Sequence, residues 1–224
     1  MQLLNRTKIQ KQLFVLVAST ILLSGLPCLA QDAAPAAPST TPAVPPTPQI
    51  IDAATYTGSS LSVGAGQTVI LDFGNQSSLQ LTGDILNAGL LYAISTNPLV
   101  NTASFSANNI TNQQGAVFSS VLPSGMFANI NPTVGQLSLV LTAVQNIVNA
   151  GSIMSSGSLS LNAGGTIVNA LPSGVSGQSP IMQAMSAVNL AALSGNITNA
   201  GLISSVSNNV NINTQLMQNL VLNN

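Results

Sequence analysis

The feature that most constrains the fold of this chain is a motif in which an Ile is followed two residues later by an Asn and, in most copies, by Ala-Gly. The Ile and Asn of the five copies are Ile85 and Asn87, Ile110 and Asn112, Ile147 and Asn149, Ile167 and Asn169, and Ile197 and Asn199. The glycines that follow are Gly89, Gly115, Gly151 and Gly201, and an extra residue precedes Gly115. One unit spans about 20–25 residues, which is too short to bury its own apolar face, so the repeat predicts units stacked around a continuous core.

Apolar residues two positions apart accompany the motif: Leu79 and Leu81, Phe105 and Ala107, Leu137 to Leu141, Leu159 and Leu161, and Val210 and Ile212. A period of two is typical of a β-strand with one buried face. Glycine at the recurring position permits a positive φ and so favours a turn between strands. We therefore predict an all-β, single-stranded parallel β-helix (β-solenoid), in which each unit is one coil and Leu and Ile stack inside.

The recurrent asparagines have two interpretations. In a parallel β-helix Asn87, Asn149, Asn169 and Asn199 would stack at a turn, where each side-chain amide can donate a hydrogen bond to the next at the strand spacing of about 4.8 Å. Alternatively, they are ordinary turn residues that form no ladder. Their repeated place beside the same Ile favours the ladder.

Charge is almost absent from most of the chain. The three basic residues, Arg6, Lys8 and Lys11, lie at the amino terminus, and no Asp, Glu, Lys, Arg or His occurs from Ile85 to Asn224. Nucleic-acid binding needs Lys or Arg to meet the phosphates, and metal binding needs His, Cys or clustered carboxylates. We therefore expect no nucleic-acid partner, no cofactor, and no catalytic, cofactor-binding or metal-binding residues.

The carboxylates near the repeats could support a polysaccharide-active enzyme only if they were paired with each other or with a cation. Asp52, Asp72 and Asp84 have no basic residue near them in the sequence. Asp52 and Asp72 are spaced so that they could stack on successive coils. We expect all three to be solvated surface groups.

The amino-terminal segment resembles a secretory signal peptide. Residues 1–30 combine a basic start, an apolar run from Leu13 to Leu26 and a small-residue cleavage site that ends at Ala30. The apolar run is shorter than the roughly 20 residues that span a bilayer, so no transmembrane segment is expected after cleavage. Pro27 departs from the lipoprotein pattern before Cys28, and cleavage after Ala30 removes this cysteine.

A Pro/Ala-rich segment, residues 31–49, should form an extended, disordered linker, because it cannot bury enough apolar surface to order itself. The β-helix domain is then expected over residues 50–224. Two protrusions from it are predicted: a short helix or loop at 179–194, where Pro180 follows a capping Ser179, and a loop at 119–136. Residues 214–222 either fold over the last coil or leave the strand edges of that coil open.

From Leu79 to Asn213 the Asn-Ala-Gly-x-Ile spacing resembles the repeats of filamentous-haemagglutinin-class bacterial exoproteins. This resemblance implies a right-handed parallel β-helix, export to the extracellular space or outer cell surface (or retention in the periplasm), and a role in adhesion or biofilm contact. The chain has no convincing version of the amino-terminal secretion domain found in that class, since Asn97-Pro98-Leu99 is only a faint echo of its motifs.

The leading functional hypothesis is an exported, non-enzymatic, adhesin-like protein whose polar, uncharged coil faces and loops contact glycans or surface proteins. The alternative is an extracellular fibre that grows by homotypic stacking of coils, because an uncapped β-helix exposes strand edges. A β-helix enzyme that acts on polysaccharides is the third hypothesis.

Overall fold

A computed structural model describes residues 47–124, 132, 135–214 and 220–222. The signal peptide predicted over 1–30 and the predicted linker up to residue 46 lie outside these residues. The first strand begins at Gln49, one residue before the predicted start of the repeat domain.

The described chain forms three parallel β-sheets, which we name A, B and C. Sheet A contains β1 (Gln49–Asp52), β3 (Thr68–Asp72), β6 (Leu90–Ile94), β9 (Val117–Ser119), β12 (Ser152–Ser155), β15 (Ile181–Ala184) and β18 (Leu202–Ser205). Sheet B contains β2 (Leu61–Val63), β5 (Ile85–Asn87), β8 (Ile110–Asn112), β11 (Ile147–Asn149), β14 (Ile167–Asn169), β17 (Ile197–Asn199) and β20 (Leu220–Leu222). Sheet C contains β4 (Ser78–Gln80), β7 (Thr102–Ala107), β10 (Ser138–Ala143), β13 (Leu159–Ala163), β16 (Val188–Ala192) and β19 (Val210–Thr214).

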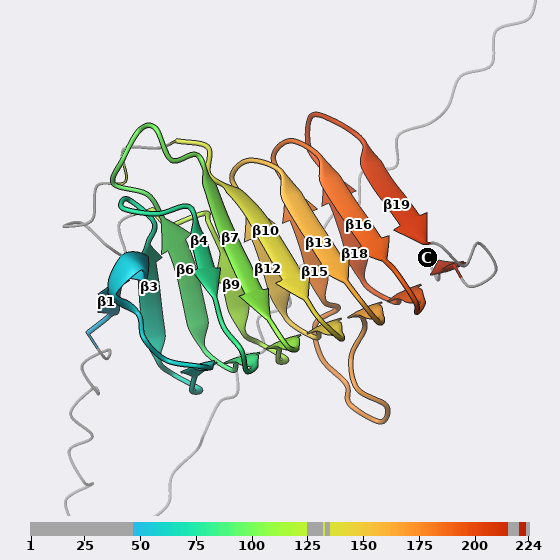
Figure 1. Ribbon diagram of the computed structural model, residues 1–224. Helices are drawn as coiled ribbons and strands as arrows, with labels where there is room; N and C mark the ends of the chain where they lie inside the picture. Colours follow the sequence, from blue (N-terminus) through green and yellow to red (C-terminus); the bar gives the residue numbers. More distant parts are fainter. Residues whose placement is uncertain (1–46, 125–131, 133–134, 215–219, 223–224) are drawn as a thin grey trace, which may run out of the picture. The chain divides into compact units, whose positions relative to one another are not determined.

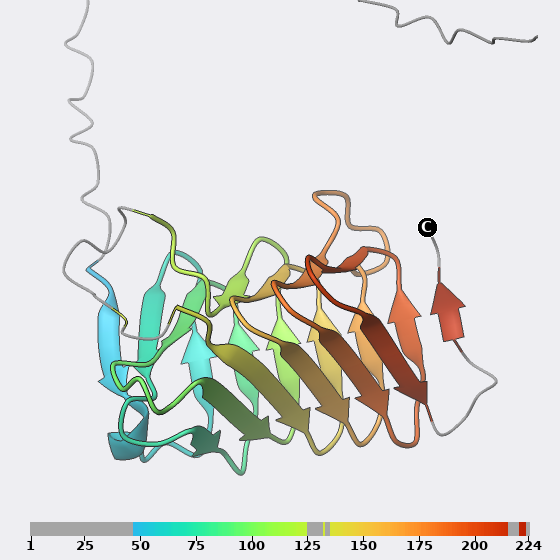
Figure 2. The same ribbon diagram turned by 90° about the horizontal axis from the view of Figure 1, so that it is seen from above.

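From β4 onward the chain visits sheets C, B and A in turn and then returns to sheet C beside the strand it left. We call one such passage a round. The strands of each sheet therefore follow one another in sequence order, as the colours in Figures 1 and 2 show. This all-β arrangement of parallel sheets is consistent with a β-helix or solenoid, as the repeat predicted.

The register places equivalent residues of successive rounds on one another. In sheet B, Ile85 aligns with Ile110, and Asn87 aligns with Asn112. In sheet C, Leu139 and Leu141 align with Leu159 and Leu161, as their spacing in the sequence predicts. The separations between consecutive motif asparagines are 25, 37, 20 and 30 residues, so the longer rounds exceed the predicted length because they include loops.

One apolar core runs between the sheets. Leu79, Ile85 and Leu91, from sheets C, B and A, belong to the same cluster of buried side chains. Phe105 makes edge-on ring contacts with Phe73 and Phe118, at centroid distances of 5.1 and 4.9 Å, and so links neighbouring rounds within the core. Burial of every second residue explains why the period-two pattern of the sequence forms strands rather than helices.

The short helix or loop predicted over 179–194 is wrong. This segment forms β15 and β16, in which Met182, Ala184, Val188 and Leu190 point into the core. The apolar spacing that suggested a helix arises because two alternating strands are separated by a short turn. Strands β12 and β13 supply paired backbone partners along β15 and β16, and this pairing outweighs the local preference.

The principal described protrusion is instead the loop from Ala170 to Pro180, between β14 and β15, whose residues Pro172 to Ser179 are all exposed. Of the loop predicted over 119–136, residues 121–124 follow β9 without regular structure, and much of the remainder lies outside the described residues. In the predicted tail segment, Leu220–Leu222 extends sheet B beside β17.

The described chain has different features at the two ends of the sheets. A 3-10 turn, η1 (Ala53–Thr55), follows β1 and buries Ala53. At the other end, Val210 is exposed and Ile212 is half-buried, although their register would direct both toward the core, because no described strand follows β19 in sheet C. Among the described residues, no helix is long and apolar enough to cross a membrane.

Candidate functional site

The motif asparagines form a continuous side-chain ladder. It contains the predicted Asn87, Asn149, Asn169 and Asn199, and Asn112, which the prediction left out, lies between the first two. All five side chains are buried. Each Nδ2 donates to the Oδ1 of the next asparagine, at 2.7 Å from Asn87 to Asn112, 2.8 Å from Asn112 to Asn149, 2.7 Å from Asn149 to Asn169 and 2.7 Å from Asn169 to Asn199. The ladder joins five rounds and satisfies polar groups that would otherwise be costly to bury.

Three of the five ladder side chains also fix the turn that follows them. The Oδ1 atoms of Asn87, Asn149 and Asn199 accept the backbone N–H two residues on, at 3.2 Å in each case. The Nδ2 atom of Asn149 reaches the Ile181 carbonyl at 3.0 Å, on the neighbouring strand of sheet A. One side chain thus closes its own turn and connects two sheets. Every buried side-chain nitrogen or oxygen in the described part of the chain has a hydrogen-bond partner.

Three of the four predicted glycines share one structural role, and the fourth does not. A Cβ on Gly89, Gly151 or Gly201 would lie 2.2–2.3 Å from a carbonyl oxygen of the preceding round, so these turns have no room for a side chain. Gly115 instead has a positive φ of 75° and open space around its Cβ position. The register places Ala116, not Gly115, in the column of Gly151, because the extra residue in that copy widens its turn.

A second polar column lies at the residue before each motif Ile. The Oδ1 of Asp84 accepts the Asn109 N–H at 3.0 Å, that of Asn109 accepts the Asn146 N–H at 3.3 Å, and that of Asn146 accepts the Thr166 N–H at 2.9 Å. Asp84 is the only charged member of this column. Carboxylates stacked at strand spacing would repel one another, whereas neutral amides can repeat without that cost.

The described carboxylates connect rounds. Asp52 and Asp72 are in register on β1 and β3, as their spacing suggested. Asp52 accepts from Asn75 at 2.6 Å, and Asp72 accepts from the Thr96 hydroxyl at 2.7 Å. The expectation that they are simply solvated is therefore incomplete, since each bonds to the next round.

The pKa of Asp84 lies below its ordinary value of 3.8. The largest cause is the hydrogen bond from the Asn109 side chain; desolvation raises the pKa, and the Asn108 side chain lowers it further. The Asn109 and Asn108 side chains donate to Asp84 at 3.1 and 3.2 Å.

Among the described residues, no group of three His, Cys, Asp or Glu side chains could hold a metal ion.

The outward side chains of sheet C form what we call the polar face. They are Ser78, Gln80, Thr102, Ser104, Ser106, Ser138, Val140, Thr142, Ser160, Asn162, Asn189, Ala191, Asn211 and Asn213. None is charged, and all but Val140 and Ala191 carry a hydroxyl or a carboxamide. Neighbouring members interact, as Asn211 does when it donates to Asn189 at 2.8 Å. Near the strand ends a cavity of about 230 Å³ lies against Thr142, Asn162 and Leu193.

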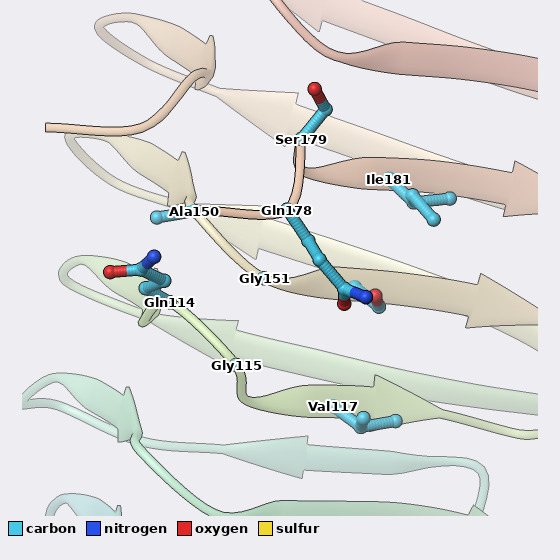
Figure 3. Close-up of a pocket in the computed structure, with 9 residues that line it drawn as sticks. Gln114, Gly115, Val117, Ala150, Gly151, Gln178, Ser179 and Ile181 are labelled. Atoms are coloured by element: carbon cyan, nitrogen blue, oxygen red, sulfur yellow. The ribbon is translucent and has the colours of Figure 1, made fainter. Parts of the chain in front are cut away.

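A more enclosed feature lies at the corner between sheets B and A, beside the Ala170–Pro180 loop. A cavity of about 380 Å³, which we call the corner groove, is lined by Gln114, Gly115, Val117, Ala150, Gly151, Ser152, Gln178, Ser179 and Ile181. Figure 3 shows Gln178 extending from the loop beside Gly151, while Val117 and Ile181 lie on strands of sheet A. A second cavity, of about 490 Å³, lies on the sheet B side, where Thr111, Val148 and Pro172 line it together with Gln114.

The loop is fastened over this corner by Gln114, whose Nε2 donates to the Ser176 carbonyl at 3.0 Å. A Cβ on Gly177 would meet the same Nε2 at 2.1 Å, so a side chain there would displace the Gln114 carboxamide from its present position. No predicted motif or site residue indicated this site. The prolines and glycines Pro172, Gly174, Gly177 and Pro180 are signals that could have indicated a loop here, but no local pattern shows that it folds back onto Gln114.

Comparison of this chain with protein-family models, with curated proteins and with solved structures finds no match. The resemblance to filamentous-haemagglutinin repeats therefore stays a prediction.

Proposed function

We propose that this protein is an exported, non-enzymatic contact protein of the adhesin type, built on a closed, right-handed parallel β-helix. The cyclic visits to sheets C, B and A and the shared core support the β-helix. The signal-like amino terminus supports export. In this view the rounds are a stable support, and their outer surfaces provide the contacts.

The observation that carries the proposal is the polar face. Its hydroxyls and carboxamides offer both donors and acceptors in regular columns, and it has no charge to be screened by salt. Such a surface suits contacts with glycans or with uncharged protein surfaces. The described carboxylates, in contrast, are engaged in bonds between rounds, which favours a structural role over acid–base catalysis.

The test is binding of the purified exported chain to arrays of immobilised glycans and surface proteins. Thr142→Glu introduces a charge into the polar face at a half-buried outward position. We expect it to weaken the retained contacts roughly tenfold, equivalent to about 1.4 kcal/mol. Thr198→Glu makes the same change at a half-buried outward position of sheet B that lines neither cavity, and we expect it to bind like the native protein. Equal loss in both variants, or no retention of the native chain, would refute the proposal.

A second candidate function is assembly into fibres. At the last described rounds, Leu202, Val206 and Val210 are exposed at 49%, 59% and 39%, and β18 and β19 end their sheets. Unpaired strand edges with apolar neighbours are able to pair with another copy. Negative-stain electron microscopy distinguishes the two functions: unbranched fibres that lengthen with concentration favour assembly, and single particles at all concentrations exclude it.

A further inference from the structure

The corner groove differs from the polar face because it is a recess, and the inserted loop from Ala170 to Pro180 forms part of its wall. Elsewhere the chain passes from sheet B to sheet A through short turns, as at Ala150-Gly151 and Ala200-Gly201. Between β14 and β15 the loop replaces that turn and reaches back to Gln114, two rounds earlier. Gln114 lines both the corner groove, of about 380 Å³, and the second cavity, of about 490 Å³. Each falls within the range of roughly 300–1,000 Å³ typical of small-molecule sites.

The floor of the groove is a regular column of side chains. Val117, Ser152 and Ile181 are in register at the starts of β9, β12 and β15. All three are half-buried. Apolar Val117 and Ile181 therefore flank a hydroxyl along the direction in which the rounds stack. An elongated ligand could lie along this column.

Uncharged polar groups border the floor and are available to a ligand. The exposed Gln178 carboxamide, the Gln114 Oε1 atom and the Ser152 hydroxyl make no hydrogen bond within the described residues. The groove contains neither a cation nor a carboxylate. An anionic ligand would lose its hydration without gaining an opposite charge, so the lining favours a neutral one.

The lining also favours a sugar over a peptide. An extended peptide has an N–H and a C=O on nearly every residue and binds sheets most readily through an unpaired strand edge. Strands β9, β12 and β15 are internal members of sheet A, with neighbours on both sides, and so offer no edge. Sugar hydroxyls can donate or accept and can match carboxamides and serine in either sense. Hydroxyls without a partner would remain in water at the open mouth of the groove.

We propose that the corner groove is a binding site for a linear, neutral oligosaccharide, oriented by Gln178, Gln114 and Ser152 and packed on Val117 and Ile181. The second cavity accommodates a further part of the same chain beside Pro172. The inference rests on the proposed contact function and adds a glycan-binding groove to the contacts of the polar face.

The experiment uses the purified exported chain and a panel of neutral linear oligosaccharides, namely gluco-, manno-, galacto- and N-acetylglucosamine hexamers, with titration calorimetry as the readout. At least one hexamer should bind. Gln178→Ala should weaken its binding about threefold to tenfold, because one of the few orienting hydrogen-bonding groups is lost. Gln145→Ala, at an exposed turn away from the groove, is the matched control and should leave the affinity unchanged. Both glutamines are exposed, so neither substitution should disturb the fold, and circular dichroism checks this.

Other outcomes separate the groove from the wider function. If Thr142→Glu abolishes hexamer binding and Gln178→Ala does not, the contact function stands and the groove proposal fails. Binding of uncharged peptides in place of every hexamer, lost in Gln178→Ala, overturns the assigned ligand class. If neither the hexamers nor the glycan and protein arrays retain the native chain, both proposals fail.

Discussion

At the scale of the residue, hydrogen bonds between asparagine side chains join the successive rounds of this protein. Its carboxamide both donates and accepts, so a column of asparagines can bond along its length, which neither carboxylates nor ammonium groups can do without repulsion. Asn112 and Asn149 show this directly, since each receives a bond from one round and gives one to the next. The absence of charge from the repeats thus has a structural reason in the described columns.

Replacement of Asn149 by alanine tests the ladder. The change removes bonds to Asn112, Asn169 and Ile181 and leaves buried partners unpaired, so we expect the free energy of unfolding to fall by about 3 kcal/mol. Asn162, an exposed asparagine on β13, is the control. Its replacement by alanine should change the free energy by less than about 0.5 kcal/mol in the same denaturant titration. Similar losses in the two variants would contradict an energetic role for the ladder.

Asp84 predicts a pH dependence. Its pKa is lowered in the folded state, principally by the Asn109 side chain, so the unfolded chain binds the proton more readily. The contribution of Asp84 to stability is therefore present above its ordinary pKa of 3.8 and is lost as the pH falls through the lower folded pKa.

Asp84→Asn keeps an acceptor for the Asn109 N–H and removes the titration. We expect the native protein to lose more stability than this variant when denaturant titrations are repeated from pH 6 down to about pH 2, a range that brackets an ordinary carboxylate. The difference between the two proteins isolates Asp84 from the other acids. Parallel acid profiles would show that Asp84 contributes nothing.

At the scale of the element, short strands are held by close turns. The turn at Ala150-Gly151 allows β11 of sheet B to pass directly to β12 of sheet A, because Gly151 lies against the backbone of the preceding round. Such a turn sets the register of both strands, so a single side chain there affects two sheets.

Gly151→Ala should therefore be costly. The added Cβ would approach the Ala116 and Gln113 carbonyl oxygens to 2.3 and 2.4 Å, and backbone atoms cannot easily move away. We expect a loss of about 1–3 kcal/mol in thermal or chemical unfolding. Gly135→Ala, where nothing lies within 4 Å of the Cβ position, should be close to neutral. A neutral Gly151→Ala would show that the turn is more adaptable than its contacts indicate.

The sequence predicted the elements that repeat and failed at those that do not. Identical spacing identified the ladder asparagines and the inward leucines, because stacking imposes the same demand on every round. The segment 179–194 was misassigned, since apolar residues of two short strands and a turn reproduce helical spacing. The sequence motif grouped Gly115 with Gly89, Gly151 and Gly201. Only the register of the strands shows that Ala116, and not Gly115, is equivalent to Gly151. The groove could not be predicted, as it depends on a contact between Gln114 and Ser176, which lie 62 residues apart.

At the scale of the whole molecule, the described chain combines a hydrogen-bonded interior with an outer surface that is almost without charge. Its only described charges, Asp52, Asp72 and Asp84, lie in the earliest rounds, and the polar face extends through the later ones. A surface of this kind should make contacts whose strength depends on donors, acceptors and shape, and hardly on ionic strength.

A salt series tests whether uncharged groups make these contacts. The purified protein, residues 31–224, would be bound to the glycan or surface protein that retains it best, and its dissociation constant measured from about 0.05 M to about 1 M sodium chloride, over which the screening length shrinks severalfold. We predict that the constant changes by less than about twofold, because no charge on the polar face or in the corner groove is available to be screened. A weakening of tenfold or more would show that charge governs the contact, and would refute contact through uncharged donors and acceptors.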